Sequence, residues 1–394
     1  MSKLLHCKID PYNSTKEEIE EEIARIKRFS GERQNEEMSI KILINSFYGA
    51  LGNKWFVAFN SDVAEAVTLQ GQDLIKYAEQ VINKYFSEFW HKDKELHAKL
   101  GITGEVKPVT KPMVVYADTD SNYISFNEVF NSCGWKGEPE DLILGINEHR
   151  LNDYLNKCFE KYAERWNTEN CQDFELESIS EAGIWLGKKK YVLDLIWKEG
   201  IKIPSLSKIK PTGVEIVQSS TPPFARKKLT ELLKYLFSNK DNFSINNLVD
   251  LLRKIKSEFE LQDPADISLS TTANNLEKFI VNDITAFEVA KGCPIHVRAA
   301  GYFNFLLNRN KSYKNKYELI KSGEKVKYYH VQTKSESEQD IFAFTPGTYP
   351  YEFAPPINHD EQFKRTILDP LNRFIEVMGY STISSNLWVE TSVF

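Results

Sequence analysis

Apolar residues recur at helical spacing through the N-terminal part of the chain. Thr15 and Glu18 form a capping-box pair, and the acidic run EEIEEE lies where a helix dipole favours negative charge. The pattern continues to about Leu51, and a continuous helix of that length would extend about 54 Å. Such a helix is too long for a compact domain, so we expect it to project outward unless the Ser30-Gly31 pair breaks it. A second helix is expected over residues 62–90.

The middle of the chain changes to the patterns of strands. The segment PMVVYADTDSNYISF predicts an apolar strand, a tight acidic turn and a second strand. Helix is expected again at about 141–166. Three further segments have strand-like patterns: DFELESIS, GIWLGKKKYVLDLIW and GVEIVQS.

The C-terminal part is helical at first and then mixed. After Pro222 the helical pattern runs to about residue 262. Aromatic strands are expected around 326–332 and 340–345, and a last helix near 360–378. Runs of strands and runs of helices in separate stretches of sequence predict an α+β fold.

Composition indicates a soluble globular protein, because 41% of the residues are hydrophobic and 27% are charged. With a formal net charge of −6, charge alone does not indicate nucleic-acid binding, and a local basic patch would be needed. No apolar run is long enough to cross a membrane, so no membrane segment is expected. The five cysteines are far apart in the sequence and are expected to be reduced thiols in a cytoplasmic protein.

Two carboxylates lie close together in the acidic turn. Asp118 and Asp120 stand at i and i+2 between two strand-like segments. Carboxylates this close repel each other unless a cation neutralises them, and oxygen ligands of this kind suit Mg²⁺. The alternative is an ordinary hairpin turn, since Asp and Thr are common turn residues.

A basic segment begins at Lys188. Seven lysines stand between Leu186 and Lys210 against two acidic residues. If Lys188, Lys189 and Lys190 belong to one strand, Lys188 and Lys190 share a face and Lys189 takes the other. Such a cluster suits phosphate contacts, although a solvated strand edge has the same composition. A second basic stretch, Arg309 to Lys327, has the same two interpretations.

The stretch KILINSFYGALGN combines residue types that a plain core helix avoids. On a helix, Lys41, Asn45, Tyr48, Gly49 and Gly52 fall on one face. This face offers a positive charge, an amide, a flat ring and bare backbone, which together suit a nucleotide. The alternative is a buried polar stripe packed closely against a neighbouring element.

Three motifs together resemble those of the family B DNA polymerases. They are K-x3-N-S-x-Y-G at 41–49, Y-x-D-T-D-S at 116–121 and K-K-x-Y at 188–191, in the order that the family has. The amino-acid sequence is most similar to those of the replicative polymerases of T-even-like bacteriophages, over roughly residues 20–380. Further similar segments are LINS-x-YGALGN, KPTGVE with the following SSTP, ANN at 273–275 and CPIHVR at 293–298.

The resemblance implies a right-hand polymerase fold with an antiparallel palm sheet. Residues 1–52 would be the C-terminal part of the fingers, residues 53–213 the palm, and residues 214–394 a mainly helical thumb with a C-terminal tail. It implies template-directed addition of dNMP to a primer 3′ end, with two Mg²⁺ ions as cofactors. Primer-template DNA and dNTP would be the ligands, in the host cytoplasm if a phage encodes the chain.

The resemblance also assigns roles to individual residues. Asp118 and Asp120 would be catalytic and would hold the metal ions, with Glu177 as a further metal ligand. Lys41, Asn45 and Tyr48 would bind the nucleotide. The DNA-binding residues would be Lys188, Lys189, Lys190, Tyr191, Lys210 and Arg298.

Departures from the family pattern qualify these assignments. Ala117 stands where Gly is usual, which stiffens the turn slightly. Lys190 stands where Arg is usual, so a bidentate phosphate contact is lost. In the family, the D-x2-S-x-Y-P motif supplies another metal-binding aspartate, and this sequence does not contain it. The residues before Lys41 are also too few for the 3′→5′ exonuclease domain. We therefore expect the C-terminal half of a split polymerase, which needs an N-terminal partner with both parts.

The alternative is a non-catalytic DNA-binding or assembly subunit of a replication complex. A neighbouring reading frame with the missing motif would favour the enzyme. The terminal residues 386–394, NLWVETSVF, loosely resemble the peptide with which relatives bind a sliding clamp. The same tail could instead pack on its own thumb.

Overall fold

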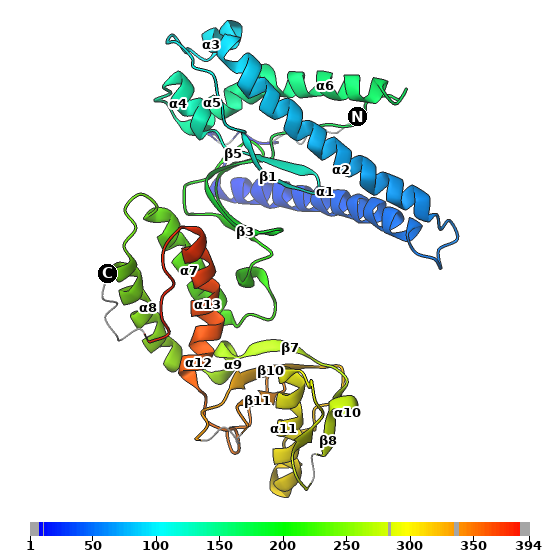
Figure 1. Ribbon diagram of the computed structural model, residues 1–394, viewed down its shortest axis with the longest axis vertical. Helices are drawn as coiled ribbons and strands as arrows, with labels where there is room; N and C mark the ends of the chain where they lie inside the picture. Colours follow the sequence, from blue (N-terminus) through cyan, green and yellow to red (C-terminus); the bar gives the residue numbers. More distant parts are fainter. Residues whose placement is uncertain (1–7, 11, 283–284, 335–338, 387–394) are drawn as a thin grey trace. The chain divides into compact units, whose positions relative to one another are not determined.

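The computed structural model describes residues 8–10, 12–282, 285–334 and 339–386 (Figure 1). These form two compact units. Unit 1 comprises residues 1–137 and 148–172, and unit 2 comprises residues 138–147 and 173–394. These units are defined by dense packing and do not test the domain boundaries predicted near residues 52 and 214. Those boundaries stay a prediction.

Unit 1 begins with one long helix, α1 (Lys16–Leu51). The Thr15 side chain accepts a hydrogen bond from the backbone N–H of Glu18, and the Glu18 carboxylate accepts one from the backbone N–H of Thr15 at 2.8 Å. This confirms the predicted capping box. The helix continues through Gly31, where a Cβ would meet nothing within 4 Å, so the alternative of a break at Ser30-Gly31 is wrong.

The rest of unit 1 packs around helix α2 (Ser61–Lys84), which confirms the second predicted helix. Trp90, in the 3-10 turn that continues α2, is fully buried and donates its indole N–H to Ser132 Oγ at 2.9 Å. Gln70 of α2 donates to the Tyr162 hydroxyl at 2.8 Å. The remaining helices and strands are α3 Lys94–Lys99, β1 Val114–Asp118, β2 Ser121–Ile124, α4 Asn127–Cys133 and α6 Asn152–Glu164.

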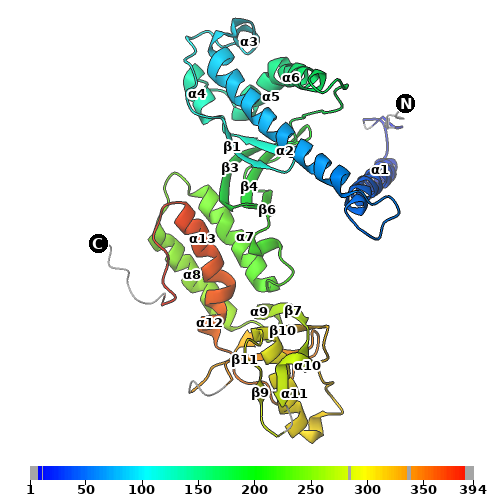
Figure 2. The ribbon, with the colours of Figure 1, turned by 45° about the vertical axis from the view of Figure 1, so that its right-hand side comes forward.

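Unit 2 contains a four-stranded antiparallel sheet in which β4 (Lys190–Lys198) is central. It pairs with β3 (Ser178–Gly187), β5 (Ile201–Lys202) and β6 (Ile209–Thr212). A three-stranded antiparallel sheet in the order β11-β10-β7 lies further along the chain. Its strands are β7 Leu269–Ala273, β10 Glu324–His330 and β11 Ile341–Phe344, and helix α11 (Ile295–Arg309) packs on it (Figure 2).

A helical core combines two helices that lie between these sheets in the sequence with one that follows the second sheet. Helix α7 (Pro223–Ser238) lies beside α8 (Ile245–Glu260) and α13 (Asp369–Val377) in both views (Figures 1 and 2). Their apolar faces share one buried cluster, which includes Leu232, Leu252 and Phe374. The remaining elements are α5 Pro139–Ile146, α9 Pro264–Ile267, α10 Leu276–Phe279, β8 Ile280–Asn282, β9 Glu288–Val289 and α12 His359–Phe363.

The mixture of helices and antiparallel sheets confirms an α+β fold. Two strand predictions need correction. GVEIVQS forms the 3-10 turn Glu215–Val217 instead of a strand, because Val214 is fully buried and Glu215 is paired with Arg373. In DFELESIS only the end, from Ser178, belongs to a strand. No helix in the described part of the chain is both long and apolar enough to span a membrane.

The buried cluster of unit 2 predicts the effect of truncating Leu232, which has no solvent exposure. Leu232→Ala should lower the free energy of unfolding of this unit by about 2–5 kcal/mol, because it removes apolar contacts and leaves a cavity. Urea unfolding, with hydrogen exchange in α7 as the probe, would measure the change in the free energy of unfolding. Leu261→Ala, at a side chain that is 86% exposed, is the control and should change stability by less than about 0.5 kcal/mol. Equal effects of the two substitutions would contradict the assigned core.

Candidate active site and nucleic-acid interface

The two carboxylates of the acidic turn lie in a two-residue hairpin loop. Strands β1 and β2 pair antiparallel with Asp118 opposite Ser121, so Thr119 and Asp120 alone form the loop. Thr119 has a φ of 55°, which is unusual for a β-branched residue. Its hydroxyl donates to Asp118 Oδ1 at 3.1 Å, and the Asp120 N–H donates to the Asp118 carbonyl at 2.7 Å. The loop therefore holds the two aspartates in neighbouring positions at one end of the hairpin.

Both carboxylates can reach solvent. Asp120 is exposed and accepts a hydrogen bond from Ser121 Oγ at 3.3 Å, whereas Asp118 is half-buried. Ala117, at the position where the family has Gly, is an ordinary residue of β1 and does not have a positive φ. The hairpin therefore forms without a glycine there.

Two asparagines that sequence reasoning missed lie at this hairpin, and one of them supports it. The side-chain oxygen of Asn83, on α2, accepts from the backbone N–H groups of Met113 at 2.7 Å and Val114 at 3.1 Å, which ties the start of β1 to the helix. Asn122, opposite Ala117, has both polar side-chain atoms buried without a hydrogen-bond partner. Asparagine spacing gives no signal for either role, because each depends on a partner distant in the sequence or on local burial.

The chemistry of the donors fits a divalent cation. Mg²⁺ is commonly held by one or two carboxylates together with substrate phosphates, and Asp118 and Asp120 supply two such groups. In the part of the chain that the structure describes, no group of three or more His, Cys, Asp or Glu side chains is arranged to hold a metal ion. Glu177 lies in unit 2, where its carboxylate is 3.8 Å from the ammonium group of Lys210.

The lysine segment forms a turn, which corrects the prediction that its lysines alternate along a strand. Gly187 of β3 pairs with Lys190 of β4, so Lys188 and Lys189 form the loop between them. Lys189 has a φ of 59°, and a residue in this left-handed conformation cannot continue a strand. The side chains of Lys188, Lys189 and Lys190 are all exposed. The turn thus presents three positive charges at one end of the sheet.

The other predicted DNA-binding residues have different environments. Tyr191 is only 5% exposed, and its ring lies beside Trp185 within the sheet. Lys210 is on β6, opposite Leu193 of β4. Arg298, on α11, is half-buried and forms an ion pair of 2.7 Å with Asp340.

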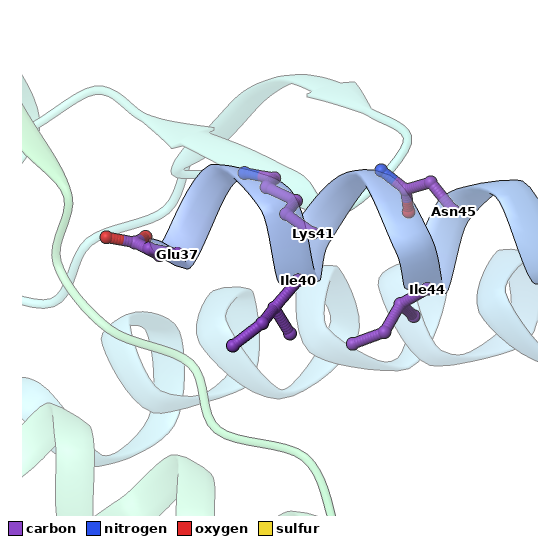
Figure 3. A pocket seen from close by; sticks show the side chains of 5 residues that line it. All are labelled: Glu37, Ile40, Lys41, Ile44 and Asn45. Carbon is purple, nitrogen blue, oxygen red and sulfur yellow. The ribbon is translucent and has the colours of Figure 1, made fainter. Parts of the chain in front are cut away.

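The predicted nucleotide-binding face of α1 is exposed, contrary to the alternative of a buried stripe. Figure 3 shows Lys41 and Asn45 on the same side of the helix, bordering an open hollow that is also lined by Glu37, Ile40 and Ile44. The hydroxyl of Tyr48 is 2.5 Å from the hydroxyl of Thr68 on α2. This hydrogen bond fixes the tip of the Tyr48 side chain.

A second face of α1 is apolar and exposed. It consists of Ile40, Leu43, Ile44 and Phe47, at i, i+3, i+4 and i+7, which we call the apolar stripe. Their exposures are 58%, 69%, 63% and 58%. In Figure 3 the side chains of Ile40 and Ile44 point away from those of Lys41 and Asn45. Helical periodicity predicts such a face but does not tell whether the chain covers it.

Comparison with known proteins agrees with the motifs. The sequence profile of DNA polymerase family B matches residues 1–134. The DNA-directed DNA polymerase of Escherichia phage RB69 is 26% identical over 306 residues, which are 74% of this chain and 31% of the relative. That of Enterobacteria phage T4 is 25% identical over 276 residues, 66% of this chain and 28% of the relative. The match thus spans about a third of the length of these relatives.

The profile match includes the α1 motif and the acidic hairpin, and the two phage polymerases extend the similarity over most of the chain. Each motif has exposed side chains, among them Lys41, Asp120 and Lys188, which can meet a ligand. The chain is therefore similar to DNA polymerases of family B, including two phage members.

Proposed function

We propose that the chain is the C-terminal part of a right-hand DNA polymerase, with the end of the fingers at 1–52, the palm at 53–213 and the thumb at 214–394. It would catalyse template-directed addition of dNMP to a primer 3′ end. The observation that carries the proposal is the two-residue loop that places Asp118 and Asp120 together at the end of the β1–β2 hairpin. Similarity to family B DNA polymerases supports the same reaction.

In this mechanism Asp118 and Asp120 would hold divalent metal ions, with Glu177 as a further ligand. Two Mg²⁺ ions held there would supply activation of the primer hydroxyl and stabilisation of the leaving-group oxygens. Asp120 is the more exposed of the two aspartates and so is the more accessible ligand. The Thr119 hydroxyl donates to Asp118 Oδ1 and so orients that carboxylate.

The face of α1 with Lys41 would contact the nucleotide, and the lysine turn at Lys188–Lys190 would contact DNA. The exposed ammonium group of Lys41 binds the phosphates of the dNTP, Asn45 supports it one turn further on, and Tyr48 lies against the nascent base pair. The turn at Lys188 and Lys189 follows the primer-template backbone, together with Lys190, Tyr191, Lys210 and Arg298. Base pairing supplies the sequence information, because phosphate contacts carry none.

A polypeptide with the D-x2-S-x-Y-P motif and the 3′→5′ exonuclease would complete the enzyme. The apolar stripe of α1 supports this, since its anchors have the i, i+3, i+4, i+7 spacing with which a partner helix is bound. The stripe borders the face with Lys41, so a partner there would complete the nucleotide site. A sliding clamp would bind residues 386–394, which lie outside the described residues except for Asn386.

Replacing Asp120 tests the catalytic assignment. In the complex with the N-terminal partner, Asp120→Asn should reduce primer extension by far more than tenfold and leave DNA binding intact, because an amide is a poor metal ligand. Single-turnover extension would measure the rate, and filter binding the affinity. The control is Asp153→Asn, which removes a surface ion pair with Lys157 of little energetic value. A rate within tenfold of the wild type, a loss of only about 1.4 kcal/mol, would exclude Asp120 as a principal ligand. A non-catalytic DNA-binding subunit would show no extension to lose.

Alanine substitutions in the lysine turn and on the α1 face should have different effects on binding. Lys189→Ala should weaken duplex binding and lower the salt slope of binding by about one unit, since it removes one phosphate contact. Lys41→Ala should leave that slope unchanged and raise the KM for dNTP. Filter binding over a salt series and steady-state kinetics would separate the two effects. An unchanged slope for Lys189→Ala, or a changed one for Lys41→Ala, would contradict the assignment.

The apolar stripe predicts where the partner binds. Ile44→Glu should raise the Kd for the N-terminal partner roughly 10- to 100-fold, because burying an isoleucine contributes about 1.5–3 kcal/mol. Calorimetric titration of the two polypeptides would measure it. The matched control is Ile42→Glu, since Ile42 is 58% exposed but lies on a different side of the helix from the stripe. Equal losses with both variants would show that the stripe is not the docking surface.

A further inference from the structure

Gly213 occupies a position that no other residue type fits. It directly follows β6, and its φ of 62° lies in the left-handed region. A Cβ on Gly213 would fall on the backbone carbonyl oxygen of Lys189, and 3.2 Å from the carbonyl carbon. Because the obstacle is backbone, a side chain here can be accommodated only if the Lys188–Lys189 turn moves.

The strand ladder brings these two positions together. Tyr191 of β4 pairs with Thr212 of β6, so the lysine turn and Gly213 lie just beyond the same end of this pair of strands. Val214, the next residue, is fully buried in the helical core of unit 2. The backbone at Gly213 is thereby anchored on both sides.

Lys189 needs external support for its conformation. With a φ of 59° it is a non-glycine residue in the left-handed region, a conformation that residues with a Cβ rarely adopt. The ladder register that pairs Gly187 with Lys190 holds the two ends of the turn. The backbone of Gly213 fills the space beside the Lys189 carbonyl and prevents the turn from relaxing in that direction.

We propose that Gly213 is a positioning residue, which fixes the Lys188–Lys189 turn so that both ammonium groups are presented in one arrangement to a nucleic-acid backbone. The proposal rests on the proposed function for the DNA contact, whereas the geometric part does not. Any substitution at Gly213 should displace the turn without removing a charge.

Hydrogen exchange tests the geometric part on the full chain. Gly213→Ala and Gly213→Asn should both speed amide exchange in residues 187–191. The Asn variant separates the clash from backbone strain, because Asn tolerates the left-handed region better than Ala. The matched control is Gly200→Ala in the next turn of the sheet, with a φ of 86° but nothing within 4 Å of the added Cβ. Unchanged exchange at 187–191 in the Gly213 variants overturns the proposal.

Duplex binding tests the functional part. The Gly213 variants should lower the salt slope by about one to two units, as the loss of one or two phosphate contacts would, although every lysine is retained. Gly200→Ala should leave the slope unchanged. If exchange rises but the slope does not fall, Gly213 shapes the turn without serving DNA binding, and the proposal is overturned. If Lys188→Ala and Lys189→Ala also leave the slope unchanged, the proposed DNA contact itself is wrong. If both Gly213 variants unfold while Gly200→Ala folds, Gly213 is needed for the fold and is not a positioning residue.

Discussion

The antiparallel ladders on either side of two short loops hold backbone conformations that the loop residues would not adopt alone. Thr119 in the acidic hairpin and Lys189 in the lysine turn both have positive φ values, of 55° and 59°. In each case only two residues connect the strands, since Asp118 pairs with Ser121 and Gly187 with Lys190. Strain of this kind persists only where the surroundings enforce it, and it concentrates at functional sites. Here it places the carboxylates and the ammonium groups that the proposed reaction requires.

The long helix α1 connects stability with function. Its face with Lys41 and Asn45 and its apolar stripe are adjacent, and both are exposed. Removing apolar surface from water is favourable by roughly 25 cal/mol per Å², so a partner that covers the four large side chains of the stripe would gain binding free energy. A partner that binds there would order the same helix that carries Lys41. Assembly and nucleotide binding would then be coupled through one element.

Much of the fold followed from local signals in the sequence. The capping box at Thr15 and Glu18 and the apolar segments around the acidic turn each depend on near neighbours, and both were confirmed. The lysine turn was missed because its loop residues lack the Gly or Asn that usually marks a two-residue hairpin. GVEIVQS has the composition of a strand, but Val214 packs in a core whose other residues are distant in the sequence, and composition does not indicate such contacts. The exposure of the apolar stripe could not be predicted either, since periodicity identifies a face and not its occupant.

We propose that the aspartates of the acidic hairpin are catalytic only after a second polypeptide supplies the D-x2-S-x-Y-P motif. The decisive measurement is primer extension with Mg²⁺, with the purified chain alone and again after adding a polypeptide that carries this motif. We expect no extension by the chain alone and template-directed extension by the mixture. Robust synthesis by the chain alone that depends on Asp120 would contradict it.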